Sequence, residues 1–241
     1  MADGNVIYLV DTPGFNDTVR SDTEILREVS AWLIQAYNAK FQLAGIIYLH
    51  SILDNRIGGT GARNLKMFRR LCGDKNLESV VLATTHWDQV DRRRAREREL
   101  ELQEEEKYWA PLIREGSRVL RHDQDETSGL KIINDLINRR TRMTLDIQRE
   151  LVDKNMRLEQ TGAGSELATV VERLLQQYEQ KIQKIEHELQ EVSKRDTDAR
   201  ERLEDAKMEW EEKFNKIQAE AKDLQATHNQ LLADERLRYE Q

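Results

Sequence analysis

The stretch "VIYLVDTPGF", residues 6–15, predicts a buried strand that delivers one carboxylate to the edge of a sheet. Five largely apolar residues, Val6 to Val10, precede Asp11, and Thr-Pro-Gly follows directly. A continuous apolar run that ends in turn residues is typical of a strand with both faces covered. Asp11 is therefore expected at the carboxyl end of a strand, and its role depends on the rest of the chain.

The chain up to about residue 140 alternates between strand and helix patterns. Ser21 and Glu24 have the spacing of a capping box, and Thr127 or Ser128 is expected to cap a later helix. Such alternation predicts an α/β fold, in which helices cover both faces of a parallel sheet and ligands bind at the carboxyl ends of its strands. The expected strands are 6–11, 43–52, 79–88 and 117–122, and the expected helices are 21–41, 60–73, 91–109 and 127–140.

Composition separates a globular part from a solvated helical part. Of the 241 residues, 34% are charged and only 6% are aromatic, which is too polar for one globule of this length. The net charge of −7 does not favour nucleic acid. Cys72 is the only cysteine, so no internal disulfide can form. No apolar run reaches the roughly 18 residues of a membrane span, and the first residues lack a signal-peptide pattern, so a cytoplasmic protein is expected.

The chain after residue 140 is expected to be helical. These features predict domains at 1–140 and 141–241, with a break near the two glycines of 161–165. Heptad spacing predicts a coiled coil within one helix over 165–241, about 115 Å long, and this apolar seam is expected to drive self-association. The seam consists of Ala168, Leu175, Ile182 and Leu189 with Val171, Tyr178, Ile185 and Val192.

Two aspartates at strand ends are the candidate binding residues. A strand ending in Asp-Thr-Pro-Gly suits a nucleotide switch, where Asp11 would hold Mg²⁺ through water and the amide of Gly14 would point at the γ-phosphate. The alternative is an ordinary strand-to-loop turn. Asp88 follows the strand "SVVLATTHWD", 79–88. Its carboxylate could accept hydrogen bonds from N1–H and the 2-amino group of guanine, with Thr85 supporting the loop and His86 against the base; the alternative is a helix N-cap.

The pair of motifs resembles a known family. Asp11-Thr12-Pro13-Gly14 and Thr85-His86-Trp87-Asp88 resemble the third and fourth guanine-nucleotide motifs of P-loop GTPases. The stretch between them, 43–73, is similar to the branch containing septins, immunity-associated GTPases and chloroplast Toc receptors. The resemblance covers about residues 5–140 and implies GTP or GDP with Mg²⁺ as cofactors, with Asp11 as the metal residue. The implied cofactor-binding residues are Asp11, Thr12, Gly14, Thr85, His86, Asp88 and His122.

The sequence also departs from this family. The fourth motif is usually Asn-Lys-x-Asp, and His122 lies where a Ser-Ala motif is usual. Phe15 replaces the water-orienting glutamine of Ras-like enzymes, so fast hydrolysis is not expected. No Gly-x-x-x-x-Gly-Lys-[Ser/Thr] occurs, and the glycine-rich 56–64 lacks the Gly-Lys pair. The front of the domain is thus expected to be missing, which leaves a vacant place between strands 6–11 and 43–52. It could close, be filled by another segment or stay empty, and low stability is expected.

Two functions follow from these patterns. The first is a guanine-nucleotide switch, incomplete at its N-terminus, with weak or no nucleotide binding and poor or absent hydrolysis. The second is a coiled-coil scaffold that uses a degenerate GTPase fold as a platform. An ATPase is disfavoured, because adenine lacks the donor pair that suits Asp88. The charged run "RRRARERELELQEEE", 92–106, is interpreted as a solvated helix face that could serve as a partner surface.

Overall fold

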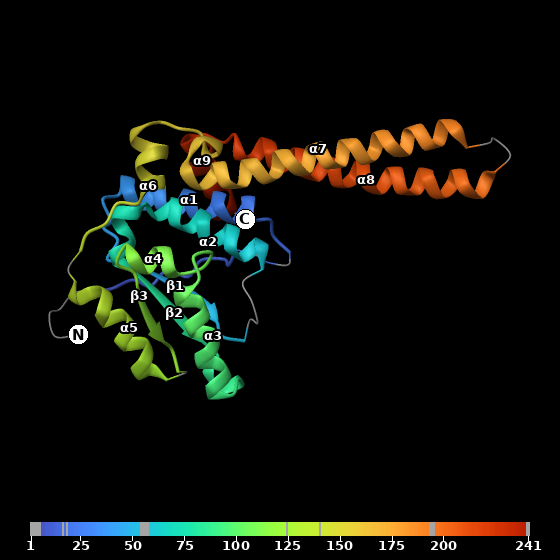
Figure 1. Cartoon of the computed structure of the whole chain (residues 1–241). Coiled ribbons are helices and arrows are strands. Elements are labelled where there is room, and N and C mark those ends of the chain that lie inside the picture. Colours follow the sequence, from blue (N-terminus) through green and yellow to red (C-terminus); the bar gives the residue numbers. More distant parts are fainter. Residues whose placement is uncertain are drawn as a thin grey trace.

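Three parallel strands form the sheet at the centre of the body (Figure 1). The structure is a computed structural model that describes residues 6–15, 17, 19–53, 58–123, 125–139, 141–192 and 196–239. The strands are β1 (Ile46–Ser51), β2 (Val80–Thr85) and β3 (Arg118–Arg121), in the order β1-β2-β3. These are three of the four predicted strands, so the predicted α/β fold with a parallel sheet flanked by helices is confirmed.

Local signals account for several helix ends of the first half. The Ser21 hydroxyl accepts from the Glu24 amide, and the Glu24 carboxylate accepts from the Ser21 amide, which confirms the capping box. Gly73, with φ of +81°, ends α2. The cap of α5 is Asp125, so the predicted caps Thr127 and Ser128 are wrong. The helices are α1 (Asp22–Asn38), α2 (Gly59–Cys72), α3 (Arg92–Glu104), α4 (Ala110–Arg114) and α5 (Glu126–Asn138), with 3-10 turns η1 (Asp74–Ser79) and η2 (Trp87–Gln89).

The predicted buried strand at 6–11 is wrong. None of residues 6–14 lies in a helix or strand, and the side chains of Val6, Tyr8 and Leu9 are 74%, 79% and 69% exposed. The reason is that an apolar segment becomes a strand only by hydrogen bonding to a neighbour. Within the described residues, β1 pairs with β2 alone and residues 6–11 pair with no strand. Three outcomes were considered for the vacant place beside β1: closure, filling by another segment, or an empty place. Among the described strands none fills it, and this edge of β1 is unpaired.

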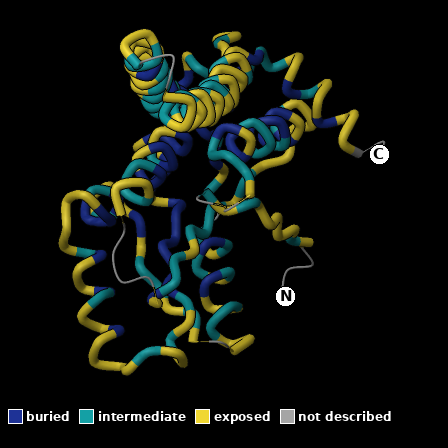
Figure 2. The backbone as a smooth tube through the Cα atoms, turned by 90° about the vertical axis from the view of Figure 1, so that its right-hand side faces the viewer, coloured by how far each residue is buried: buried dark blue, intermediate teal, exposed yellow. Residues whose placement is uncertain are grey.

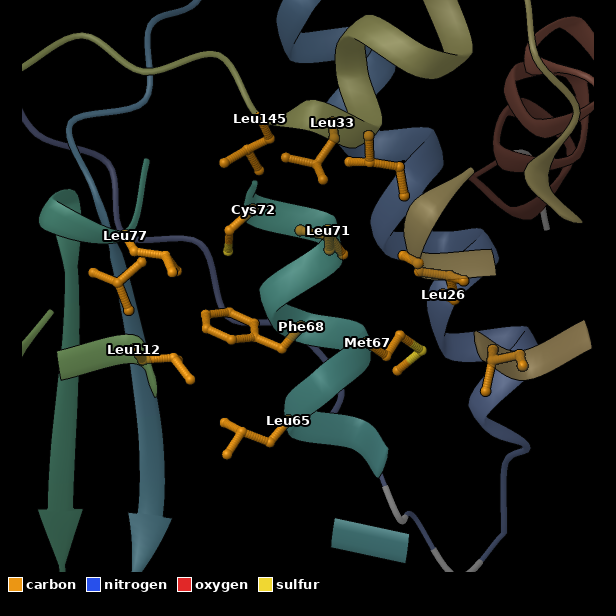
Figure 3. Close-up of a cluster of buried hydrophobic side chains, with 14 of the residues drawn as sticks. Leu26, Leu33, Leu65, Met67, Phe68, Leu71, Cys72, Leu77, Leu112 and Leu145 are labelled. Carbon is orange, nitrogen blue, oxygen red and sulfur yellow. The ribbon is translucent and has the colours of Figure 1, made fainter. Parts of the chain in front are cut away.

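Helices cover the two faces of the sheet unequally. On one face, Val80 and Leu82 of β2 pack in a large cluster with the apolar sides of α1 and α2, which Figure 3 shows in close-up. On the other face, Val81 and Ala83 pack against α5. Figure 2 shows buried residues gathered within the body and exposed residues on the outer turns of its helices. Cys72 lies in the large cluster, where burial raises the pKa of its thiol.

The second half folds back on itself as a helical hairpin (Figure 1). Its elements are α6 (Asp146–Gln148), η3 (Arg149–Asp153), η4 (Leu158–Gln160), α7 (Gly162–Glu191), α8 (Thr197–Leu224) and α9 (His228–Tyr239). The Tyr178 and Trp210 ring centroids lie 5.3 Å apart across the α7–α8 seam. The predicted single helix over 165–241 is therefore wrong. Heptad spacing shows only that the apolar stripe of the helix must pack against another helix. A helix of the same chain can do this with a smaller loss of translational and rotational entropy than a second chain.

One buried cluster draws on both sides of residue 140. Leu145, Ile147 and Leu158 are fully buried and belong to the same cluster as Leu26 and Met67. Helix α9 also packs on α1, where Arg27 pairs with Asp234 and Arg238 pairs with Glu28. The ranges 1–140 and 141–241 thus share their interior. Among the described residues, no helix is both long and apolar enough to cross a membrane.

Residues 161–165, where a break before the long helix is predicted, contain the N-cap and the first turn of α7. Thr161 is its N-cap and accepts from the Gly164 amide at 2.9 Å. A Cβ on Gly164 would lie 1.8 Å from the Leu158 carbonyl oxygen, a backbone atom that must move to make room. At Gly162 the nearest atom to such a Cβ would be 3.4 Å away. Gly164 is therefore required by close backbone approach, and Gly162 is not.

Gly164→Ala is expected to lower the free energy of unfolding by about 2 kcal/mol, the typical cost of forcing extra atoms into a packed site. Gly162→Ala is the matched control, and it should leave stability unchanged or raise it by about 0.5 kcal/mol, because alanine restricts the unfolded chain. Urea unfolding followed by circular dichroism measures both. Equal stability of the two variants would contradict the close approach at Gly164.

Candidate functional site

The carboxyl ends of β2 and β3 form the candidate site. The His122 amide donates to the Thr84 carbonyl at 2.8 Å, which continues the pairing of β2 and β3 and sets Thr85 beside His122. The Thr85 hydroxyl lies 2.8 Å from His86 Nδ1 and 3.4 Å from the His50 carbonyl oxygen. Thr85, His86 and His122 are therefore brought to one end of the sheet, as predicted from the strand ends.

A strained residue turns the chain at this end. His86 has φ of +62° and ψ of 35°, the left-handed conformation that costs a non-glycine residue about 1 kcal/mol or more. The turn leads into η2, where Asp88 is exposed. Asp91 caps α3 by accepting from the amides of Arg93 and Arg94 at 3.0 and 3.2 Å. The alternative role of Asp88 as the N-cap of this helix therefore does not hold, and its carboxylate is on the surface.

A polar network around the buried Glu99 and Thr84 holds this turn, and no sequence pattern predicted it. The Glu99 carboxylate, 5% exposed, accepts from Arg121 Nε at 2.9 and 3.0 Å and from the Thr84 hydroxyl at 3.2 Å. Trp87 Nε1 donates to the Thr84 hydroxyl at 3.0 Å, and the Arg121 guanidinium lies 4.3 Å from the Trp87 ring centroid. The hydrogen bond to Glu99 raises the pKa of Arg121. The network fixes Trp87, and with it the turn that carries His86 and Asp88.

Glu99→Ala is expected to lower the free energy of unfolding by about 1–2 kcal/mol, because the buried Thr84 hydroxyl loses its acceptor, whereas the Arg121 side chain is 42% exposed and water can solvate its charge. Glu97→Ala is the control on the same helix. Its carboxylate pairs with Arg93 on the surface, 3.3 Å apart, so the change should cost less than about 0.5 kcal/mol. Chemical unfolding compares the two. A cost for Glu99→Ala no larger than that for Glu97→Ala would show that the network does not stabilise the turn.

The first turn of α5 orients His122. Its Nδ1 lies 2.8 Å from the Ser128 hydroxyl, and that hydroxyl also accepts from the Asp123 amide at 3.2 Å. The Asp125 carboxylate accepts from the Ser128 amide at 2.7 Å, which lowers the pKa of Asp125. The half-buried His122 ring is thus held at the end of β3 beside the candidate site.

The structure does not join the Asp11 motif to this site. Asp11, Thr12 and Gly14 are exposed residues of the irregular segment 6–14. Within the described residues, no hydrogen bond or ion pair links Asp11 to the turn at Thr85, and no group of three or more histidine, cysteine or acidic side chains could hold a metal ion. A Cβ on Gly14 would meet no atom within 4 Å. Among the described residues, the Asp11 motif therefore stands apart from the turn at the end of β2.

A separate hollow of about 590 Å³ lies between β3 and α5. It lies on the α5 side of the sheet, and none of the predicted site residues lines it. It is lined by Leu120, Thr127, Leu130, Lys131, Asn134, Asp135 and Asn138. The candidate site is thus an exposed turn held by the Glu99 network, and it is distinct from this hollow.

Comparison with protein-family models and with curated proteins gives no match for this chain. The arrangement of residues at the ends of β2 and β3 therefore carries the functional argument.

Proposed function

We propose that this chain is a guanine-nucleotide-binding protein of the P-loop GTPase kind, with the base held at the carboxyl ends of β2 and β3. The observation that carries the proposal is Asp88. Its carboxylate is exposed beside His86 at a strand end, and Asp91 supplies the helix cap that would otherwise account for it. An acceptor at the carboxyl end of a parallel strand is where ligands of α/β sheets bind.

The chemistry of Asp88 favours guanine. A carboxylate accepts hydrogen bonds from N1–H and the 2-amino group of guanine, and charge-assisted bonds of this kind contribute about 1.5–3 kcal/mol each. Adenine presents an acceptor at N1 and has no 2-amino group, so the same carboxylate would repel it. His86 would lie against the base, and Thr85 with His122 would support the turn from the strand ends.

The phosphates would be held weakly by these residues. The sequence contains no Gly-x-x-x-x-Gly-Lys-[Ser/Thr], whose amides and lysine normally bind the β- and γ-phosphates. Asp11 would hold Mg²⁺ through water, and Thr12 and Gly14 would approach the γ-phosphate, as the family resemblance implies. With Phe15 after the glycine, hydrolysis would be slow or absent. The chain would then bind GTP and GDP mainly through the base.

Titration calorimetry of the full chain with GDP, GTP and ADP, each with and without Mg²⁺, tests the proposal. We expect GDP and GTP to bind more weakly than about 100 μM, which corresponds to less than about 5.5 kcal/mol, and ADP to bind at least about tenfold more weakly still. Micromolar GTP binding would contradict the weak phosphate contacts. Equal binding of ADP and GDP would contradict the role of Asp88.

The helical hairpin supports a second candidate function, a scaffold. Figure 1 shows α7 and α8 projecting well beyond the body, and the 30 residues of α7 span about 45 Å. Self-association was predicted because the apolar stripe of α7 needs a covering helix. In the structure α8 of the same chain covers this stripe, so self-association remains a prediction that the exposed stripe no longer supports. A chain that binds no guanine nucleotide, but loses its cellular role when the hairpin is shortened, would favour the scaffold.

A further inference from the structure

An unpaired strand edge and an unpaired apolar segment occur in the same chain. Within the described residues, β1 pairs with β2 on one side and with no strand on the other. The Ile52 amide donates to the Thr85 carbonyl at 3.0 Å, so the even-numbered residues of β1 direct their backbone groups towards β2. The backbone groups of Ile47, Leu49 and Ser51 therefore point to the open side, where a further strand would pair with them.

Residues 6–11 have the pattern of such a strand. Their sequence, VIYLVD, has the same length as IIYLHS of β1 and shares with it the tripeptide Ile-Tyr-Leu. The side chains of Val6, Tyr8 and Leu9 are largely exposed, and Leu49 of β1 is 64% exposed. Burial stabilises apolar side chains of this size, and the two segments would gain burial by lying side by side.

The connection between the two segments suits parallel pairing. Parallel strands need a crossover, usually a helix, and α1 lies between residues 11 and 46. Phe15 is partly buried and packs against the large cluster, so the chain is anchored to the body four residues after Asp11. Residues 6–11, the strap, therefore extend from a fixed end, and only their pairing with the sheet is missing.

We propose that the strap closes onto the open edge of β1 as a fourth parallel strand, with Asp11 beside Ser51. In this register Tyr8 lies next to Tyr48, which packs against the cluster on the side of α1 and α2. Closure buries apolar surface, but it also orders six residues of chain. These two contributions are of similar size, so the open form that the structure describes and the closed form are both populated.

Closure changes the candidate site, and this step rests on the proposed function. Asp11 would lie at the carboxyl edge of the sheet, two strands from Thr85 and thus about 10 Å away. The Asp11 motif would then face the same nucleotide as the turn at Asp88. A ligand that contacts Asp11 only in the closed form shifts the population towards that form. The strap therefore decides whether the Asp11 motif belongs to the site, and GTP with Mg²⁺ favours closure.

Amide hydrogen exchange of the full chain, followed by NMR, tests closure without any nucleotide. The amides of Leu49 and Ser51 would bond only to the strap, whereas those of Tyr48 and His50 bond to β2 in either form. A strap that is open about one fifth of the time slows the outward amides by about fivefold. We therefore expect Leu49 and Ser51 to lose about fivefold protection when the strap is prevented from closing.

Tyr8→Asp prevents closure, because it places a charge where the closed strap buries an apolar side chain. Val19→Asp is the matched control, because Val19 is 87% exposed and lies outside the strap, so its exchange should equal that of the unchanged chain. In Tyr8→Asp the amides of Tyr48 and His50 should stay protected. Closure would be overturned if the exchange at Leu49 and Ser51 were the same with and without this change, or if protection fell equally at Tyr48 and His50.

The same amides test the link between the strap and the site. Millimolar GTP with Mg²⁺ should slow the exchange at Leu49 and Ser51 by a further factor of about three in the unchanged chain, and by none in Asp11→Asn. If GTP binds and the exchange does not change, the strap is not coupled to the site. If GTP does not bind, the proposed function fails, and the comparison with Tyr8→Asp still decides whether the strap closes.

Discussion

Residues 1–140, expressed without the rest of the chain, are expected to show no cooperative thermal transition. The apolar sides of α1 and α2 pack against residues beyond 140, including Leu145, Ile147 and Leu158. Removing those neighbours exposes several large apolar side chains at about 1.5–3 kcal/mol each. The sum approaches the total of about 5–15 kcal/mol that stabilises an ordinary domain.

Calorimetry and circular dichroism of residues 1–140 beside the full chain measure this effect. The full chain should unfold in one transition that includes both α1 and the base of the hairpin, because they share one cluster of buried residues. The fragment should retain partial helix and lose cooperative melting. A cooperative transition of the fragment above about 55 °C, within the ordinary range of mesophilic domains, would show that the shared core is not required.

Asp88→Asn is expected to change the base that the chain prefers. Xanthine carries an oxygen where guanine carries the 2-amino group. An asparagine amide can donate to that oxygen, whereas the Asp88 carboxylate repels it. The variant should lose about tenfold in GDP binding, which corresponds to about 1.4 kcal/mol, and should gain binding of xanthosine diphosphate. The exchange of preference separates base recognition from general damage to the fold.

Asp91→Asn is the matched control for this change. It removes the same charge three residues away, and asparagine caps a helix about as well as aspartate, so α3 should stay intact. Its GDP binding should equal that of the unchanged chain. If both variants weaken GDP equally, or if Asp88→Asn does not gain xanthosine diphosphate, then Asp88 does not read the base.

Local sequence signals predicted the elements whose causes are local. The capping box at Ser21, the stop at Gly73 and the apolar runs of β1 and β2 act within a few residues of themselves. The prediction of a strand at 6–11 was wrong because a strand needs a neighbouring strand to pair with, and an apolar segment does not show whether one is present. The prediction of one continuous helix over 165–241 was wrong for a related reason. A heptad stripe on α7 does not show whether the helix that covers it belongs to the same chain or to another.

The candidate site shows the same division. The sequence predicted the position of Thr85, His86 and Asp88 because they end an apolar strand, and that position follows from sheet geometry. Glu99 and Arg121 were missed, although they support the turn, because their contact joins residues 22 positions apart on different elements. The helical spacing of Ala95, Glu99 and Leu102 could have placed Glu99 on the apolar side of α3, but it could not have identified Arg121 as its partner. Such pairings arise only when α3 packs against β3.

An NMR titration of the isotope-labelled full chain with GDP tests directly whether the base binds where β2 and β3 end. We expect the amide shifts of residues 85–90 and 121–123 to change as GDP is raised to millimolar concentration. The same titration with ADP should leave these amides unchanged. Shifts confined to other regions, such as the glycine-rich start of α2 at 58–62, or no shifts at all, would contradict the assignment of this edge of the sheet as a guanine site.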